Sequence, residues 1–186
     1  MRLIVGMSGS TGLIYGIRLL QLLKPMPDVQ TFLIMSRVAK MNAAIETDWS
    51  LKDIENLADE VYSDKDVAAA ISSGSFKTDG MVVVPCSMKT LSGIAHSYAE
   101  TLIVRAADVV LKERRQLVIV PRETPLSLAH IDNMRCVTEA GAVVLPASPG
   151  WYYEVKSPLD LVDFVVARIC DQLGVEHTLC KRWGEE

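Results

Sequence analysis

Short apolar runs alternate with longer amphipathic segments along the whole chain. Five of the runs are rich in apolar and β-branched residues and predict buried strands at residues 2–6, 30–35, 81–84, 117–120 and 142–145. The longer segments repeat apolar residues at helical spacing and predict helices at residues 11–23, 38–46, 90–96, 101–114, 127–139 and 159–173. Residues 50–75 are more polar, and we expect acidic helical turns and a serine-rich loop there.

This alternation of strands and helices indicates a parallel sheet with helices on both faces. The predicted strands lack polar alternation, which fits strands that are buried on both sides. No internal repeat or linker interrupts the pattern. We therefore expect one α/β domain over residues 1–186, a three-layer, doubly wound parallel sheet of the flavodoxin or Rossmann type.

The composition and the length of the apolar runs indicate where in the cell the protein is located. Hydrophobic residues make up 49% of the 186 residues, and the mean hydropathy is +0.23. No apolar run reaches the roughly eighteen residues of a spanning helix, and the N-terminus lacks the layout of a signal peptide. We therefore expect a cytoplasmic protein with no membrane partner, whose surplus apolar surface is buried between subunits.

Charge and metal-ligating residues argue against two further classes of protein. The net charge of −4 and the pI near 5.4 disfavour a nucleic-acid partner, for which a basic surface is expected. The four cysteines show no CxxC spacing, and the three histidines are scattered. The sequence therefore predicts neither a metal site nor a disulfide framework, and it favours a metal-independent mechanism.

The segment after the fourth predicted strand carries the most informative pair of charges. Arg122 and Glu123 lie between two prolines, directly after the apolar run at residues 117–120. Ligands of open α/β proteins bind outside the carboxyl ends of the strands, where such a pair is suited to hold an anion and move a proton. The alternative is a solvated turn with a capping role for Glu123 or Thr124.

A loop rich in glycine and hydroxyl groups follows the first predicted strand and opens a helix. Its sequence, Gly6-Met7-Ser8-Gly9-Ser10-Thr11-Gly12, offers a tight turn, backbone N–H groups and hydroxyl donors for a phosphate. The spacing is not GxGxxG, and no acidic residue ends the second strand to bind a ribose, which disfavours NAD and favours FMN. Ser36, at the end of the second strand, either touches the flavin or caps the next helix, and capping is also the alternative for the glycine loop.

The third predicted strand ends in small polar residues that again open a helix. The segment reads Pro85-Cys86-Ser87-Met88-Lys89-Thr90 and predicts an anion or a ring edge bound over backbone N–H groups. Cys86 is a candidate nucleophile, but it has no local histidine or CxxC partner. A buried apolar cysteine is the favoured interpretation.

Several charged and aromatic residues lie outside these loops. Arg105 and Lys112 are seven residues apart on one helix face, and Arg105 has apolar neighbours that suggest a desolvated ionic role. Arg168 falls in the middle of an apolar helix, where a buried cation needs a partner. The aromatic cluster at residues 151–153 either lines a substrate pocket or packs a subunit interface. Glu46 lies too far along its helix to cap the start, so surface solvation is the common explanation.

Taken in this order, the motifs resemble the flavin prenyltransferase family, long labelled aromatic acid decarboxylases. The resemblance covers nearly the whole chain and rests on Gly9-Ser10-Thr11-Gly12, Glu46-Thr47-Asp48, Pro85-Cys86-Ser87-Met88-Lys89-Thr90, Arg105-Ala106-Ala107-Asp108-Val109, Leu111-Lys112-Glu113-Arg114-Arg115, Val120-Pro121-Arg122-Glu123-Thr124-Pro125, Pro149-Gly150-Trp151-Tyr152 and Arg182-Trp183-Gly184. It implies a flavodoxin-like fold that binds FMN and assembles as a homododecamer. The implied reaction joins a dimethylallyl group from dimethylallyl phosphate to N5 and C6 of reduced FMN. The product, prenylated FMN, would serve a partner decarboxylase of the ubiquinone-pathway type.

The resemblance also implies a role for each matching residue. The positions that match FMN-binding residues of the family are Gly9, Ser10, Thr11, Ser36, Ser87, Met88, Lys89, Thr90 and Arg122. The positions around the prenyl phosphate are Glu46, Arg105, Lys112, Glu123, Tyr152, Arg168 and Trp183. Glu123 is the expected proton donor, Thr11 and Glu46 are expected relay members, and Lys112 adds catalytic charge. Relatives usually have Ala-Ser where this chain has Ser10-Thr11, so a hydroxyl group is kept at the second position.

The role expected for Glu123 as a proton donor requires that its carboxyl group be buried. A carboxyl group keeps its proton near neutral pH only in a buried setting. The charge of Arg122 opposes this, so we expect Arg122 to point towards the flavin and Glu123 to face the departing phosphate.

Two other functions are compatible with parts of the sequence. A flavin-dependent cysteine decarboxylase shares the fold and a Pro-x-Ser-x-x-Thr turn, but that family usually has a histidine after the first helix and an asparagine in place of Lys89. Residues 38–46 contain no histidine. A non-catalytic FMN-binding subunit would explain the phosphate loops, but neither a buried Arg168 nor the charge set around Lys112.

Overall fold

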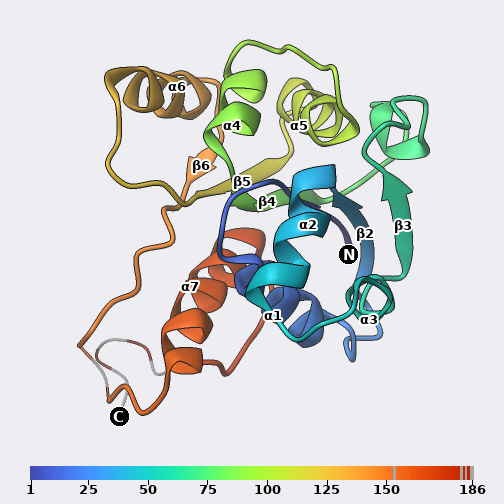
Figure 1. Ribbon diagram of the computed structural model, residues 1–186. Coiled ribbons are helices and arrows are strands. Elements are labelled where there is room, and N and C mark those ends of the chain that lie inside the picture. The colour runs from blue at the N-terminus through green and yellow to red at the C-terminus, as the bar shows by residue number, and fades with distance from the viewer. Residues whose placement is uncertain (153, 181, 183, 185–186) are drawn as a thin grey trace.

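Six parallel strands form one sheet at the centre of the molecule (Figure 1). The computed structural model describes residues 1–152, 154–180, 182 and 184. The strands are β1 (Arg2–Met7), β2 (Gln30–Met35), β3 (Glu60–Ser63), β4 (Gly80–Cys86), β5 (Gln116–Pro121) and β6 (Val143–Val144). Their spatial order is β3-β2-β1-β4-β5-β6, which is the Rossmann arrangement. The order reverses between β1 and β4, so the loops after these two strands frame the crevice where ligands of such sheets bind.

Helices cover both faces of the sheet (Figure 1). One layer contains α1 (Leu13–Leu23), α2 (Arg37–Glu46), α3 (Leu51–Glu55) and α7 (Pro158–Leu173). The other contains α4 (Met88–Ala95), α5 (Leu102–Lys112), α6 (Leu128–Glu139) and the short 3-10 helix η1 (Ala70–Ser72). Because side chains alternate along a strand, Val82 and Val84 of β4 pack with the first layer and Met81 and Val83 with the second. The predicted three-layer, doubly wound sheet is confirmed.

Serine hydroxyl groups fix where several helices begin. The hydroxyl groups of Ser36, Ser50, Ser87 and Ser127 accept a hydrogen bond from the backbone N–H three residues further on. This contact satisfies one of the N–H groups that the first helical turn leaves without an internal partner. The predicted ends of the six long helices lie within two residues of the observed ones, and a serine cap marks the start of three of them, α2, α4 and α6.

The edge strand β3 is the one element of the sheet that the sequence did not predict. Glu60, Val61 and Ser63 are exposed, and Tyr62 is partly buried with its ring stacked on Phe32 at 6.3 Å. An edge strand with so little buried surface needs no continuous apolar run, so its sequence resembles a polar loop. The described helices include none that is both long and apolar enough to cross a membrane.

Candidate functional site

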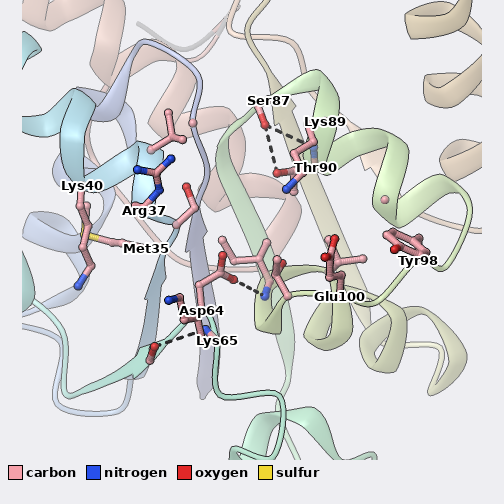
Figure 2. Close-up of a pocket in the computed structure, with 18 of the residues that line it drawn as sticks. Met35, Arg37, Lys40, Asp64, Lys65, Ser87, Lys89, Thr90, Tyr98 and Glu100 are labelled. Atoms are coloured by element: carbon pink, nitrogen blue, oxygen red, sulfur yellow. Dashed lines mark hydrogen bonds between the residues drawn. The ribbon is translucent and has the colours of Figure 1, made fainter.

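A cavity of about 1310 Å³ lies along the carboxyl edge of the sheet (Figure 2). Its walls come from the loops after the first four strands and from the connection between α4 and α5. Figure 2 shows Ser87, Lys89 and Thr90 on one side and Arg37 and Lys40 on the other. The predicted cofactor residues that line this cavity are Gly9, Ser36, Ser87, Lys89 and Thr90. The structure therefore brings together residues from three separate sequence motifs.

The hydroxyl groups of the buried Ser8 and the partly buried Ser87 tie the loops of β1 and β4 together at the crevice. The Ser8 hydroxyl donates to the carbonyl of Pro85 at 3.2 Å and accepts from the N–H of Ser87 at 2.8 Å. The Ser87 hydroxyl in turn donates to the Thr90 hydroxyl at 3.1 Å and caps α4. Ser8 is fully buried, so it positions the α4 N-terminus and does not reach a ligand in the cavity. Ser36 caps α2, as one of its two interpretations predicted, and it also lines the cavity, where contact with a flavin stays a prediction.

Arg122, directly after β5, is partly buried and keeps its Nε atom away from solvent. The Ser10 hydroxyl donates to the backbone carbonyl of Arg122 at 2.6 Å and joins the glycine loop to this strand end. The Nε atom of Arg122 is buried and has no hydrogen-bond partner among the described residues. Burial raises the pKa of Tyr15, and the positive charge of Arg122 partly offsets this rise. An unpaired buried donor costs about 1–3 kcal/mol, so this position is suited to an acceptor such as FMN.

Glu46 is exposed, as the solvated interpretation expects, and its carboxylate also caps a helix other than its own. Its Oε2 atom accepts from the N–H of Gly12 at 2.7 Å and from that of Leu13 at 3.3 Å, at the start of α1. A carboxylate is stabilised there by the positive end of the helix dipole. These are the N–H groups that the sequence assigned to a phosphate. Thr11 is exposed and precedes Gly12, so it lies next to this carboxylate in the chain.

Arg105 and Lys112 extend from one side of α5 towards η1 and the loop after it, as their spacing predicted. Arg105 donates to the carbonyl of Ser72 at 3.2 Å and pairs with Asp108 at 3.1 Å. Lys112 pairs with Glu113 at 2.5 Å next to Gly74. Neither Arg105 nor Lys112 lines the 1310 Å³ cavity.

Tyr152 and Arg168 gather at a second place, beside the outer edge strand β6. The Tyr152 ring packs edge-on against Phe164 of α7, with 5.7 Å between ring centroids and an interplanar angle of 78°. Arg168 follows Phe164 by one helical turn, and both line a smaller cavity of about 320 Å³. Gly150 makes this arrangement possible, because a Cβ atom there would lie 3.0 Å from both rings. Trp183, assigned to the same site, lies outside the described residues.

The expected burial of Arg168 was wrong. Its side chain is 49% exposed and pairs with Asp171 at 2.6 Å. The buried face of α7 includes Val165, Val166 and Ile169. Residue 168 lies between them in the sequence but on the opposite, exposed face of the helix. A local run of apolar residues therefore gave a misleading picture of a position that the helical period turns outwards.

Glu123 is exposed in the single chain. Its Oε1 atom accepts from the N–H of Thr124 at 3.1 Å, a contact within its own turn. The buried setting that a proton donor requires is therefore absent from one copy of the chain, as far as the described residues extend. The solvated-turn alternative describes this isolated copy.

Cys86 is a structural thiol. It is completely buried at the end of β4, and desolvation raises its pKa to about 12, while hydrogen bonds with Ser8 and Leu91 act in the opposite direction. The thiolate, which is the nucleophilic form, is therefore scarce at neutral pH. Among the described residues, no group of three His, Cys, Asp or Glu side chains is arranged to hold a metal ion.

We expect the Cys86→Ala variant to keep the activity of the wild-type protein within about twofold, because the Cys86 side chain only fills space in a closed core. Iodoacetamide should fail to label Cys86 in the folded protein at pH 8, and mass spectrometry of tryptic peptides would check this. Rapid labelling, or loss of activity without loss of folded protein, would show a chemical role for the thiol.

A doubly wound parallel sheet with hydroxyl groups, a glycine loop and a partly buried arginine at its carboxyl edge defines an α/β protein that binds a phosphorylated ligand. The flavoprotein family matches residues 1–170. The flavin prenyltransferase UbiX of Escherichia coli (strain K12) is 50% identical over 184 residues, which cover 98% of this chain and 97% of that protein. The chain therefore belongs to the flavoprotein family and, within it, to the flavin prenyltransferases.

Two solved structures share the fold almost completely. The dodecameric FMN-dependent UbiX-like decarboxylase of Escherichia coli O157:H7 superposes with a TM-score of 0.96 at 52% identity, over 98% of this chain and 99% of that one. AnUbiX (PadA1), in complex with FMN and dimethylallyl pyrophosphate, also gives a TM-score of 0.96, at 46% identity over 100% of this chain and 98% of that one. The flavodoxin- or Rossmann-like architecture and the family resemblance are both confirmed.

Proposed function

We propose that this chain transfers a dimethylallyl group from dimethylallyl phosphate to N5 and C6 of reduced FMN, without a metal ion. The observation that supports this most is the near-identity of fold with AnUbiX, whose structure holds FMN and a dimethylallyl donor. Residues 1–186 act in this proposal as a single flavin-binding domain. Reduced FMN supplies the two nucleophilic ring positions, and the chain's own residues bind, orient and protonate.

The FMN end of the site uses the carboxyl edge of the sheet. In this proposal the cofactor is held by Gly9, Ser10, Thr11, Ser36, Ser87, Met88, Lys89, Thr90 and Arg122. The α4 N-terminus faces the cavity with Ser87 and Thr90 aligned, which suits a phosphate or a ring edge. Arg122 has a buried Nε donor without a described partner, and an acceptor on FMN would satisfy it.

The prenyl-phosphate end is proposed to form between copies of the chain. Arg105 and Lys112 reach the loop after η1, Tyr152 and Arg168 lie beside β6, and Glu123 points into solvent. These groups do not converge within one copy. Exposed apolar side chains on α2 and around α6, such as Ile45 at 79% and Leu128 at 73%, supply surface that assembly would bury. A homododecamer like that of the Escherichia coli O157:H7 relative would bring the groups together and bury Glu123.

Each of these groups has a definite task in the proposed reaction. The departing phosphate must be stabilised by positive charge, which Arg105, Lys112 and Arg168 provide. Tyr152 adds a hydrogen bond to the same group. Glu123 delivers a proton to the departing phosphate. Thr11 and Glu46 are proposed to relay protons, which is supported by the contact of the Glu46 carboxylate with the loop directly after Thr11. Trp183 is assigned to the same end by resemblance alone.

The product, prenylated FMN, is proposed to pass to a partner decarboxylase that acts on aromatic acids in a pathway of the ubiquinone type. The cytoplasm is the proposed location. All four cysteines are free thiols, which is the usual state in a reducing compartment.

Purified protein given reduced FMN and dimethylallyl phosphate should release a flavin that is heavier by one prenyl group. Mass spectrometry of the released flavin measures this, and dimethylallyl diphosphate run in parallel identifies the preferred donor. An unchanged flavin bound tightly would support a non-catalytic binding subunit. Release of carbon dioxide from a peptide with a C-terminal cysteine would support the cysteine decarboxylase instead.

A further inference from the structure

Asp171, near the end of α7, gathers three hydrogen-bond donors on one carboxylate. Its Oδ2 atom binds Nη1 of Arg168 at 2.6 Å, and its Oδ1 atom binds Nη2 of Arg182 at 2.7 Å and Nε2 of His177 at 3.2 Å. The Asp171 side chain is only 16% exposed, whereas the two arginines are about half exposed. The carboxylate is therefore the fixed centre of the group, and the arginines are arranged around it.

The charges of this group favour the ionised carboxylate. Burial acts to raise the pKa of Asp171, but the hydrogen bonds from Arg182 and His177 and the charges of Arg182 and Arg168 together lower it. The His177 ring is 2% exposed, and its Nδ1 atom accepts from the N–H of Leu179 at 3.4 Å, which leaves Nε2 as the donor to Asp171. Both oxygen atoms of Asp171 thus have charged or buried partners.

We infer that Asp171 is a positioning residue for the prenyl-phosphate end of the site: it orients Arg168 and holds His177 and Arg182 against α7. Arg168 uses one N–H in this contact and lines the 320 Å³ cavity, so further guanidinium donors remain for an anion. The inference rests on the proposed function, because that function places the phosphate at Arg168. The residue immediately after Arg182 is Trp183, which the same proposal assigns to the substrate.

Asp163 provides a matched comparison on the same helix. Its side chain is 14% exposed and it binds Arg18 of α1 through two hydrogen bonds, at 2.6 and 3.1 Å. That pair joins two helices of the layer and does not line the 320 Å³ cavity. Loss of either carboxylate removes a similarly buried ion pair, but only Asp171 is linked to Arg168.

The test compares Asp171→Asn and Asp163→Asn in the full-length, FMN-loaded protein. We expect Asp171→Asn to raise the Kd for dimethylallyl phosphate, measured by calorimetry, about tenfold, the size of one charge-assisted hydrogen bond. The Kd for FMN should not change, and amide hydrogen exchange should become faster in residues 175–182. Asp163→Asn should change neither affinity nor the exchange of this segment, although its Tm should fall.

A conservative variant covers the case in which Asp171→Asn does not fold. Asp171→Glu keeps the charge and should recover most of the affinity for dimethylallyl phosphate. An unchanged Kd for dimethylallyl phosphate in folded Asp171→Asn, equal weakening for FMN, or the same effect in Asp163→Asn would overturn the inference. Wild-type protein that binds dimethylallyl phosphate without transferring it would refute the proposed function alone, and wild-type protein that does not bind it would refute both.

Discussion

Replacement of Glu123 by glutamine is expected to leave FMN bound and to slow prenyl transfer at least about a hundredfold, the lower range for loss of a general acid. The amide keeps the size of the side chain and its hydrogen-bonding capacity. It cannot deliver a proton to the oxygen that leaves with the phosphate. Single-turnover absorbance changes of the flavin measure the rate, and a flavin titration measures binding.

Glu100 provides the control for this experiment. It is an exposed carboxylate that lines the 1310 Å³ cavity, and no part of the proposed reaction uses it. Glu100→Gln should leave the rate within about twofold, because Glu100 takes no part in the proposed proton transfer and exposed substitutions usually change a free energy by no more than about 0.5 kcal/mol. Full activity in Glu123→Gln would remove Glu123 from its assigned role and leave the local turn contact with Thr124 as its function.

The fold could be predicted because its signals are local. Uninterrupted runs such as residues 81–84 indicate strands buried on two sides, and serine caps mark where helices begin. The strand β3 was missed because an edge strand buries too little surface to need an apolar run. What could not be read locally is which strand lies beside which, although the alternation of elements restricted the sheet to parallel arrangements.

Only those candidate site residues that come directly after a strand could be predicted from the sequence pattern. The residues after β1, β4 and β5 were found because ligands of such sheets bind at that edge. Glu46 accepts from the start of α1, and Asp171 accepts from Arg182 beyond the end of α7; no local pattern announces these two contacts. Tyr15, which lies close enough to sense the charge of Arg122, was missed for the same reason.

The proposed assembly offers one explanation for the exposure of both Arg168 and Glu123. Both were expected to be buried on chemical grounds, and both are at the surface of one copy of the chain. The chemistry expected of a residue refers to its surroundings in the working protein. In an assembled protein these surroundings include other copies of the chain. The exposure of Arg168 and Glu123 therefore fits the proposed assembly, as do the exposed apolar residues on α2 and α6.

Replacement of Arg122 by leucine should have opposite effects on FMN affinity and on the stability of the FMN-free protein. The Kd for FMN should rise roughly ten- to a hundredfold, because a hydrogen bond to a charged group contributes about 1.5–3 kcal/mol. The FMN-free protein should melt at the same temperature or slightly higher, because the variant no longer buries an unpaired Nε donor. A flavin fluorescence titration and thermal melts with and without FMN measure the two effects.

Arg37 separates this effect from a general loss of positive charge. It lines the same cavity from α2 and is exposed, so Arg37→Leu should change the Kd for FMN much less than Arg122→Leu does. A ligand that binds only the folded state raises its stability according to the ratio of ligand concentration to Kd. The FMN-dependent rise in Tm should therefore shrink in Arg122→Leu and persist in Arg37→Leu. A lower Tm of FMN-free Arg122→Leu with unchanged FMN affinity would mean that the Arg122 side chain supports the fold and does not hold the flavin.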